Sequence, residues 1–195
     1  LFKFKNQTQT FETLIEPAEM FKIIQGFGSN IVYSIYEDTK ENIWLSILNV
    51  GVVRCNQTTK KHTFFNNSNG LSANKIKCFF EDNEGNILIG TSGEGLDVFT
   101  SEAFVSHNKK NGLADNQIWA ISEANAGTYW FGTNEGVSVY DANETIISKS
   151  YKNITHEQGL PSGNVRALVK DKAGNMWIGI WGGKVIKYDV NANRL

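Results

Sequence analysis

The stretch that decides the fold runs from Tyr129 to Asp141 and reads YWFGTNEGVSVYD. Two short apolar runs, rich in aromatic and β-branched residues, flank a polar turn that carries Gly132 and Gly136. Such runs are typical of β-strands, and the glycine-containing turn between them predicts a β-hairpin. Near-copies of this hairpin occur elsewhere in the chain, so it is one unit of a repeated architecture.

Four copies come into register when the chain is compared with itself, and they begin at Gly26, Gly70, Gly112 and Gly159. Each copy continues into an alternating apolar run, a polar turn and a second apolar run. The second runs are led by Trp44, Leu88, Trp130 and Trp177, which are 44, 42 and 47 positions apart. A third run in the last three copies ends in an aromatic and a polar residue, as in Tyr140-Asp141.

These runs are too short for helices and are bounded by Gly, Asn and Asp turns, so they are expected to be strands. A weaker fourth run follows at residues 62–65, 103–106 and 146–149. Four short antiparallel strands at a period of about 44 residues are typical of a β-propeller blade. An immunoglobulin-like sandwich gives no reason for that period. We therefore expect an all-β fold, a β-propeller of four-stranded antiparallel blades with about four blades present.

Composition and charge place the chain among ordinary globular proteins. It has 195 residues, of which 41% are hydrophobic and 20% are charged, and its net charge is -1. No cluster of like charges predicts binding to nucleic acid. No apolar stretch approaches the roughly 18 residues that span a bilayer, so direct membrane insertion of this segment is not expected.

The whole chain, residues 1–195, is expected to form a single propeller region. Its predicted parts are the end of a truncated blade (1–25), three repeats (26–69, 70–111 and 112–158) and an incomplete repeat (159–195). Residues 1–5 align with the third strand at 185–189, and residues 10–14 are expected to be a fourth strand. An open arc of blades exposes apolar surface and strand edges. Three arrangements therefore stay open: an arc of a larger ring, which we favour, closure of the last blade by the N-terminal strands, and pairing of two arcs.

Two segments of the chain read GLADNQIWAISEANAGTYWFGTNEGVSVYD and GLPSGNVRALVKDKAGNMWIGIWGGKVIKYD. Both segments resemble the two-component regulator propeller repeat. The resemblance implies seven-bladed rings, a periplasmic location and the sensor region of a membrane-anchored regulator, commonly a hybrid histidine kinase that responds to glycans. The first repeat departs most from the pattern, because Leu45-Ser46-Ile47 replaces Ile-Gly-Thr and Cys55 replaces an aromatic residue. Local irregularity is therefore expected in that blade.

No catalytic constellation is apparent. The histidines His62, His107 and His156 lie far apart and share no repeat position with a nucleophile and a carboxylate. The acidic residues that recur at 37/38, 81/82 and 171 coincide with hairpin turns, where Asp bonds its own backbone. Two cysteines lack the paired spacing of a zinc site. We expect no catalytic residue, no metal site and no cofactor.

Candidate ligand-binding residues appear where the repeats disagree. At the start of the innermost strand, one register position holds Tyr33, Lys77, Trp119 and Arg166, while its neighbours stay apolar. Loops between strands two and three share a face with the loops between blades, which adds Glu94, Glu135 and Trp181. Aromatic rings can stack on sugars, and cations can bind hydroxyl or carboxylate groups. The alternative is inter-blade packing with extended Lys and Arg stems.

The sequence thus favours a non-enzymatic, extracytoplasmic sensor module of a two-component receptor. Its expected partners are an oligosaccharide ligand, other blades of the same receptor and a second copy in a homodimer. Two other functions stay open: a propeller that serves as a protein interaction scaffold, and a propeller lyase or hydrolase.

Overall fold

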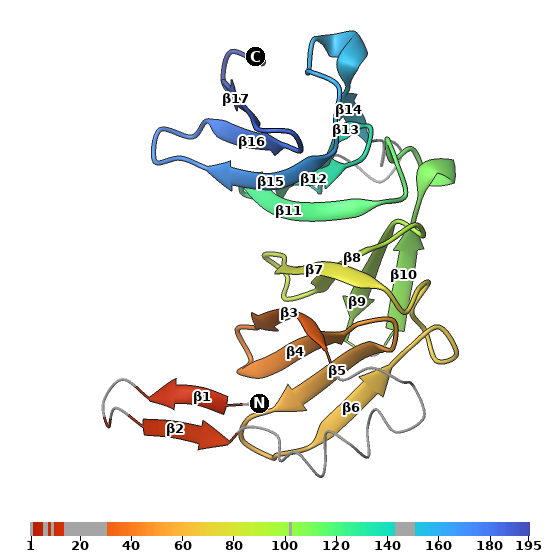
Figure 1. The fold of residues 1–195 in the computed structure, drawn as a ribbon, viewed down its shortest axis with the longest axis vertical. Coiled ribbons are helices and arrows are strands. Elements are labelled where there is room, and N and C mark those ends of the chain that lie inside the picture. The colour runs from red at the N-terminus through yellow and green to blue at the C-terminus, as the bar shows by residue number, and fades with distance from the viewer. Residues whose placement is uncertain (1, 6–7, 9, 14–30, 102, 143–150) are drawn as a thin grey trace.

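The computed structural model describes residues 2–5, 8, 10–13, 31–101, 103–142 and 151–195, which form an all-β structure (Figure 1). Its strands form antiparallel sheets in which each strand pairs with the next one in sequence. A two-stranded ribbon contains β1 (Phe2–Lys5) and β2 (Thr10–Thr13), and blade 1 contains β3 (Val32–Glu37), β4 (Asn42–Ile47), β5 (Gly51–Asn56) and β6 (His62–Phe65).

The remaining sheets follow the same plan. Blade 2 contains β7 (Ile76–Glu81), β8 (Ile87–Thr91), β9 (Leu96–Thr100) and β10 (Ala103–His107). Blade 3 contains β11 (Ile118–Asn125), β12 (Thr128–Thr133), β13 (Gly136–Asp141) and β14 (Lys152–Ile154). Blade 4 contains β15 (Val165–Lys170), β16 (Met176–Ile180) and β17 (Lys184–Tyr188). The short 3-10 helices η1 (Lys109–Asn111) and η3 (His156–Gln158) lie in linkers between blades.

The predicted propeller fold is confirmed by these sheets. One strand differs from its prediction: the fourth strand of blade 3 is β14, which pairs through Ile154 with Val137 and through Lys152 with Val139. Its sequence KNI carries little apolar signal, and the predicted run at 146–149 lies outside the described residues. Within the described ranges, no helix has the length and apolar character needed to cross a membrane.

The blades follow one another along an arc (Figure 1). The first strands of successive blades are neighbours, since β3 contacts β7, β7 contacts β11 and β11 contacts β15. These strands are therefore the innermost ones. The ribbon pairs β1 with β2 antiparallel, as expected for the third and fourth strands of a blade. In the described residues this ribbon and blade 4 are separate sheets, so pairing of β1 or β2 with β17 is not observed.

Aspartates close the turns between the first and second strands. The Asp38 carboxylate accepts hydrogen bonds from Asn42 N (2.7 Å), Asn42 Nδ2 (2.8 Å) and Trp44 Nε1 (2.8 Å). Asp171 accepts equivalent bonds from Asn175 and from Trp177 Nε1, the latter at 2.9 Å. The predicted turn role of these acids is confirmed. The same carboxylate also ties the leading tryptophan of the second strand to its own turn.

The cores lie between blades. Trp44 is buried between blades 1 and 2 in a cluster with Phe79 and Phe99. Trp130 is buried between blades 3 and 4, where its ring centroid lies 5.1 Å from that of Tyr188. Trp177 occupies the same strand position in blade 4 and is 38% exposed. The second strand therefore contributes the residue that each blade buries against its successor.

Close approach of adjacent blades depends on a glycine in the second strand. This glycine faces a small residue of the first strand in the pairs Cys78↔Gly90, Ala120↔Gly132 and Ala167↔Gly179. A Cβ atom on Gly132 would lie 2.8 Å from Val165 Cγ1 and 2.9 Å from the Val165 carbonyl oxygen in blade 4. A side chain at this position would therefore push the next blade away.

Blade 1 accommodates its departures from the repeat pattern. Ser46 takes the glycine position and donates a 3.5 Å hydrogen bond to the Ile76 carbonyl of blade 2. Cys55 is buried among Ile43 and Val53. The sheet has four paired strands, and its one register shift recurs in the other blades. The expected local irregularity of this blade is therefore wrong, because a small hydroxyl and a thiol fit the available space.

We expect Gly132→Ala to lower the free energy of unfolding by about 1–3 kcal/mol, the usual cost of overpacking an interior. Gly179→Ala is the matched control, because its Cβ would meet only Ala167, at 3.1 Å for the nearest atom. Both changes reduce unfolded-state entropy alike, so their difference isolates the clash between blades. Urea denaturation followed by circular dichroism measures the free energy of unfolding of both variants. An equal decrease in the two variants would contradict the proposed role of Gly132.

We expect Asp38→Ala to destabilise the fold by about 1–3 kcal/mol, because it leaves the buried indole N–H of Trp44 without an acceptor. Asp171→Ala is the comparison variant, since Trp177 is accessible to water and can replace the lost bond there. Thermal denaturation should show the larger decrease in melting temperature for Asp38→Ala. A larger decrease for Asp171→Ala would show that the buried indole bond is not the important one.

Candidate functional site

A β-bulge occurs at the same place in the first strand of every blade. The strand register skips one residue between Val32 and Ser34, and it does so again at the matching place in β7, β11 and β15. The skipped residues are Tyr33, Lys77, Trp119 and Arg166. A bulge leaves its extra residue unpaired and redirects the side chain. The position that varies between repeats is therefore a repeated bulge along the innermost strands.

Lys77 lies between two aromatic rings from the adjoining blades. Its Nζ atom is 4.5 Å from the ring centroid of Tyr33 and 4.6 Å from that of Trp119. It also donates a 3.4 Å hydrogen bond to the Tyr33 hydroxyl. These are cation–π distances, at which an ammonium group is attracted to the ring face.

Arg166 continues the pattern in blade 4. Its Cζ atom lies 3.2 Å from the ring centroid of Trp119 and 4.9 Å from that of Trp181, which follows β16. Aromatic and cationic side chains thus alternate across all four blades. We call this set the central row: Tyr33, Lys77, Trp119, Arg166 and Trp181.

The cations of the central row are not neutralised within the described part of the chain. No carboxylate there pairs with Lys77 or Arg166, and the buried Nε of Arg166 has no hydrogen-bond partner. Buried polar atoms normally have a partner, so this nitrogen is an exception that calls for an explanation. The ends of the row are accessible, since Tyr33 is 47% and Trp181 is 71% exposed.

Glu94 and Glu135 lie outside the central row. They belong to the turns that follow β8 and β12, where their backbone N–H groups donate to Thr91 Oγ1 (3.2 Å) and Thr133 Oγ1 (3.1 Å). Both side chains are exposed. The structure thus gathers the other sequence-predicted site residues into one row and places these two acids on the adjoining turn face.

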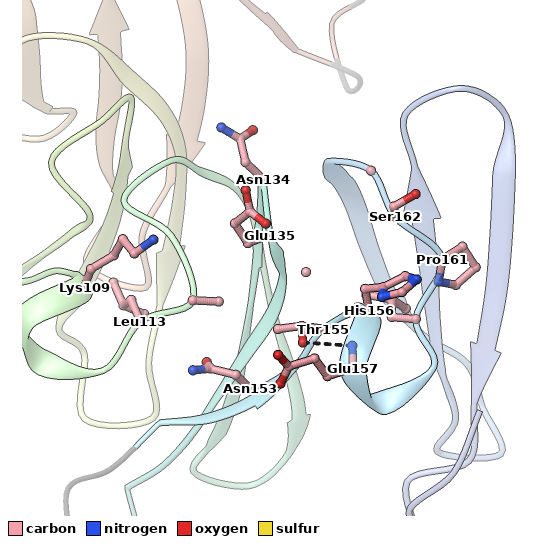
Figure 2. A pocket seen from close by; sticks show the side chains of 14 residues that line it. Lys109, Leu113, Asn134, Glu135, Asn153, Thr155, His156, Glu157, Pro161 and Ser162 are labelled. Atoms are coloured by element: carbon pink, nitrogen blue, oxygen red, sulfur yellow. Dashed lines mark hydrogen bonds between the residues drawn. The ribbon is translucent and has the colours of Figure 1, made fainter.

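A pocket opens beside the row on that turn face (Figure 2). Trp119 Nε1 donates a 2.8 Å hydrogen bond to Asn134 Oδ1, and Asn134 lines the pocket. The pocket has a volume of about 540 Å³ and lies between the β12–β13 turn and two inter-blade linkers. Figure 2 shows Lys109 and His156 on opposite sides of it, with Glu135 and Glu157 between them.

Capping boxes hold the linkers that form the pocket walls. Asn108 accepts a hydrogen bond from Lys110 N, and its own N–H donates to Asn111 Oδ1 at 3.0 Å. Thr155 and Gln158 make the same exchange around η3. Such caps satisfy the free backbone groups at the start of a helical turn, so the walls are ordered in advance of any ligand.

Sequence reasoning missed the pocket residues Lys109, His156 and Glu157, which come from these linkers, and Asn153, which lies in β14. A signal was present: each linker carries a capping residue followed three positions later by Asn or Gln and then by Gly-Leu, as in Asn108 to Leu113. Asn153 is held in place because Ser138 Oγ donates to its Oδ1 at 2.8 Å. In the described residues, no group of three or more His, Cys, Asp or Glu side chains is placed to hold a metal ion.

Solved structures with the same fold include extracellular and surface proteins of bacteria. The extracellular domain of the proposed hybrid two component system BT3049 from B. thetaiotaomicron superimposes with a TM-score of 0.71 at 20% identity, over 98% of this chain and 25% of that one. The extracellular domain of BT4673, a proposed one component system from the same organism, gives 0.74 at 22% identity, over 90% and 26%.

A third structure is PorZ, a surface component of the type-IX secretion system of Porphyromonas gingivalis, with a TM-score of 0.62 at 15% identity, over 84% of this chain and 26% of that one. The chain therefore spans about a quarter of the length of these proteins. At such identities the likeness shows the fold alone. A comparison with curated protein sequences gave no significant match.

The sequence model of the family described as "two component regulator propeller" matches residues 70–93, 112–135 and 159–182. Each matched segment starts at the Gly-Leu of a linker and includes one bulge residue of the central row. The first repeat is not among the matched segments, in agreement with its larger departures from the pattern. Three of the four repeats of the chain therefore match the sequence pattern of the two component regulator propeller family.

Proposed function

We propose that this chain is part of the extracytoplasmic, periplasmic sensor module of a two-component receptor and binds an oligosaccharide through the central row. The family of its repeats and the fold that it shares with extracellular receptor domains support this proposal. The single observation that carries the ligand-binding part is the repeated bulge, which turns one aromatic or cationic side chain of every blade toward the same row.

The two ends of the row are suited to sugar stacking. Trp119 contacts both Lys77 and Arg166, so cations from the blades on either side already cover it. Trp181 has one such contact and is largely exposed, and Tyr33 is half-exposed. Rings of this kind bind the apolar faces of sugars, and the adjoining pocket adds amide and carboxylate groups for hydroxyls.

Signal relay requires two arrangements of the receptor. In the proposed mechanism, a bound ligand favours one arrangement of a homodimer and thereby biases the attached signalling unit. A ligand shifts such an equilibrium only by its difference in affinity for the two arrangements. Other blades of the same receptor would cover the apolar face of blade 4, where Val169 is 60% and Val185 is 65% exposed.

A protein interaction scaffold is the second candidate function. The observation that favours it is the exposed apolar face of blade 4, together with the same fold in a secretion-system component. A propeller lyase or hydrolase is the third function, and turnover of a glycan would reveal it. Fold alone does not distinguish these functions, because one fold carries many sites.

We expect the chain to bind at least one member of an array of neutral and acidic oligosaccharides. For a bound member, Trp181→Ala should weaken affinity about tenfold, equivalent to about 1.4 kcal/mol, because a stacking surface is removed. Trp177→Ala is the matched control, since this indole is also accessible on blade 4 but lies outside the row. Isothermal titration calorimetry measures both affinities.

Three results would count against this proposal. Absence of binding to every glycan, with retention of the fold by circular dichroism, would favour the scaffold. Equal loss of affinity in Trp181→Ala and Trp177→Ala would place the ligand elsewhere on blade 4. Appearance of cleaved glycan products during the titration would favour the enzyme.

A further inference from the structure

The central row carries two positive charges, on Lys77 and Arg166, that pair with no carboxylate in the described part of the chain. Lys77 Nζ forms one long hydrogen bond, to a neutral tyrosine hydroxyl, and the Arg166 Nε is buried without any partner. Both side chains are half-buried, and the cost of removing part of a cation from water is only partly offset by cation–π attraction. Removing one hydrogen-bond partner from a buried group costs free energy, so such groups are usually satisfied by protein, water or ligand.

We infer that the central row recognises the anionic groups of an acidic oligosaccharide. This inference rests on the proposed sensor function and specifies the class of its ligand. Carboxylates of uronic acids and sulfate esters share the required chemistry, which is a planar or tetrahedral oxyanion on a sugar ring. A guanidinium group binds such oxyanions through paired N–H donors, whereas an ammonium group acts as a point charge.

The arrangement of the row favours a chain of sugars over a free anion. Lys77 and Arg166 approach the same indole ring from the blades on either side of β11, at 4.6 Å and 3.2 Å from its centroid. Two anionic groups of one oligosaccharide, separated by a neutral part of the sugar chain, can therefore contact one cation each. The exposed rings of Tyr33 and Trp181 extend the row beyond the cations at each end, where sugar faces can stack.

The neighbouring pocket directs the anionic groups to the row. Glu135 and Glu157 line that pocket and repel anions, although Lys109 partly offsets them. The chain as a whole has a net charge of -1, so general attraction does not account for binding of an acidic glycan. Selectivity for the acidic form must then come from Lys77 and Arg166.

The test compares matched glycans that differ only in charge. Tetragalacturonate is paired with its methyl ester, and a chondroitin sulfate tetrasaccharide with its unsulfated form, each titrated calorimetrically into the chain. We expect the more acidic member of at least one pair to bind about tenfold more tightly, the usual size of a hydrogen bond to a charged group. The two pairs distinguish recognition of carboxylate from that of sulfate.

Variants locate the effect on the row. Arg166→Gln and Lys77→Gln should each reduce the ratio of the affinities for the acidic and neutral forms from about tenfold to near one. Lys170→Gln is the matched control, because this exposed lysine ends the strand that carries Arg166. Raising the ionic strength from about 0.01 M to 0.15 M shortens the Debye length from about 30 Å to 8 Å and should weaken only the acidic form.

The outcomes separate this inference from the proposed function. If both members of each pair bind with equal affinity, and Trp181→Ala weakens that binding, the anion inference is overturned and the proposed glycan-sensor function still stands. A charge preference unchanged in Arg166→Gln and Lys77→Gln would also overturn it. Absence of all glycan binding would overturn both proposals. Circular dichroism melts of each variant confirm that the fold is intact.

Discussion

Burial of each blade against its successor is the constraint on which the rest of the structure depends. A four-stranded sheet of this size cannot cover its own apolar faces. Alternate side chains of its second strand therefore pack against the preceding blade and against the following blade. Trp44 and Trp130 perform this role from equivalent positions, and the glycine at Gly132 lets the next blade approach. The blade that lacks a successor in the described residues leaves Trp177 exposed.

The same constraint produces the central row. Innermost strands of adjacent blades come close together, and a bulge in each one turns a residue out of the hydrogen-bonded register. A residue freed from pairing is also free to vary, because neither the core nor the sheet specifies it. Packing therefore fixes where the row lies, while its chemistry can change from one repeat to the next, as from Lys77 to Trp119.

Much of the fold could be predicted from the sequence, because strand period, turn glycines and turn aspartates are local signals. The strand β14 could not, since its residues Lys152–Ile154 carry no apolar alternation and pair only because β13 offers an open edge. The irregularity expected for blade 1 was wrong because Ser46 replaces a glycine without a clash and gains a hydrogen bond. Side-chain volume, which decides such cases, is not visible in a repeat pattern.

Some features of the candidate site could likewise be predicted from the sequence, and others could not. The sequence by itself determined that one position per repeat varies between aromatic and cationic residues, and that Glu94, Glu135 and Trp181 belong to turns. Only the tertiary structure decided that Trp181 joins the row, that both glutamates lie outside it, and that linker residues such as His156 enclose a pocket. The physical reason is that contacts between blades depend on the direction of each side chain in space, whereas repeat spacing specifies only which residues occupy equivalent places.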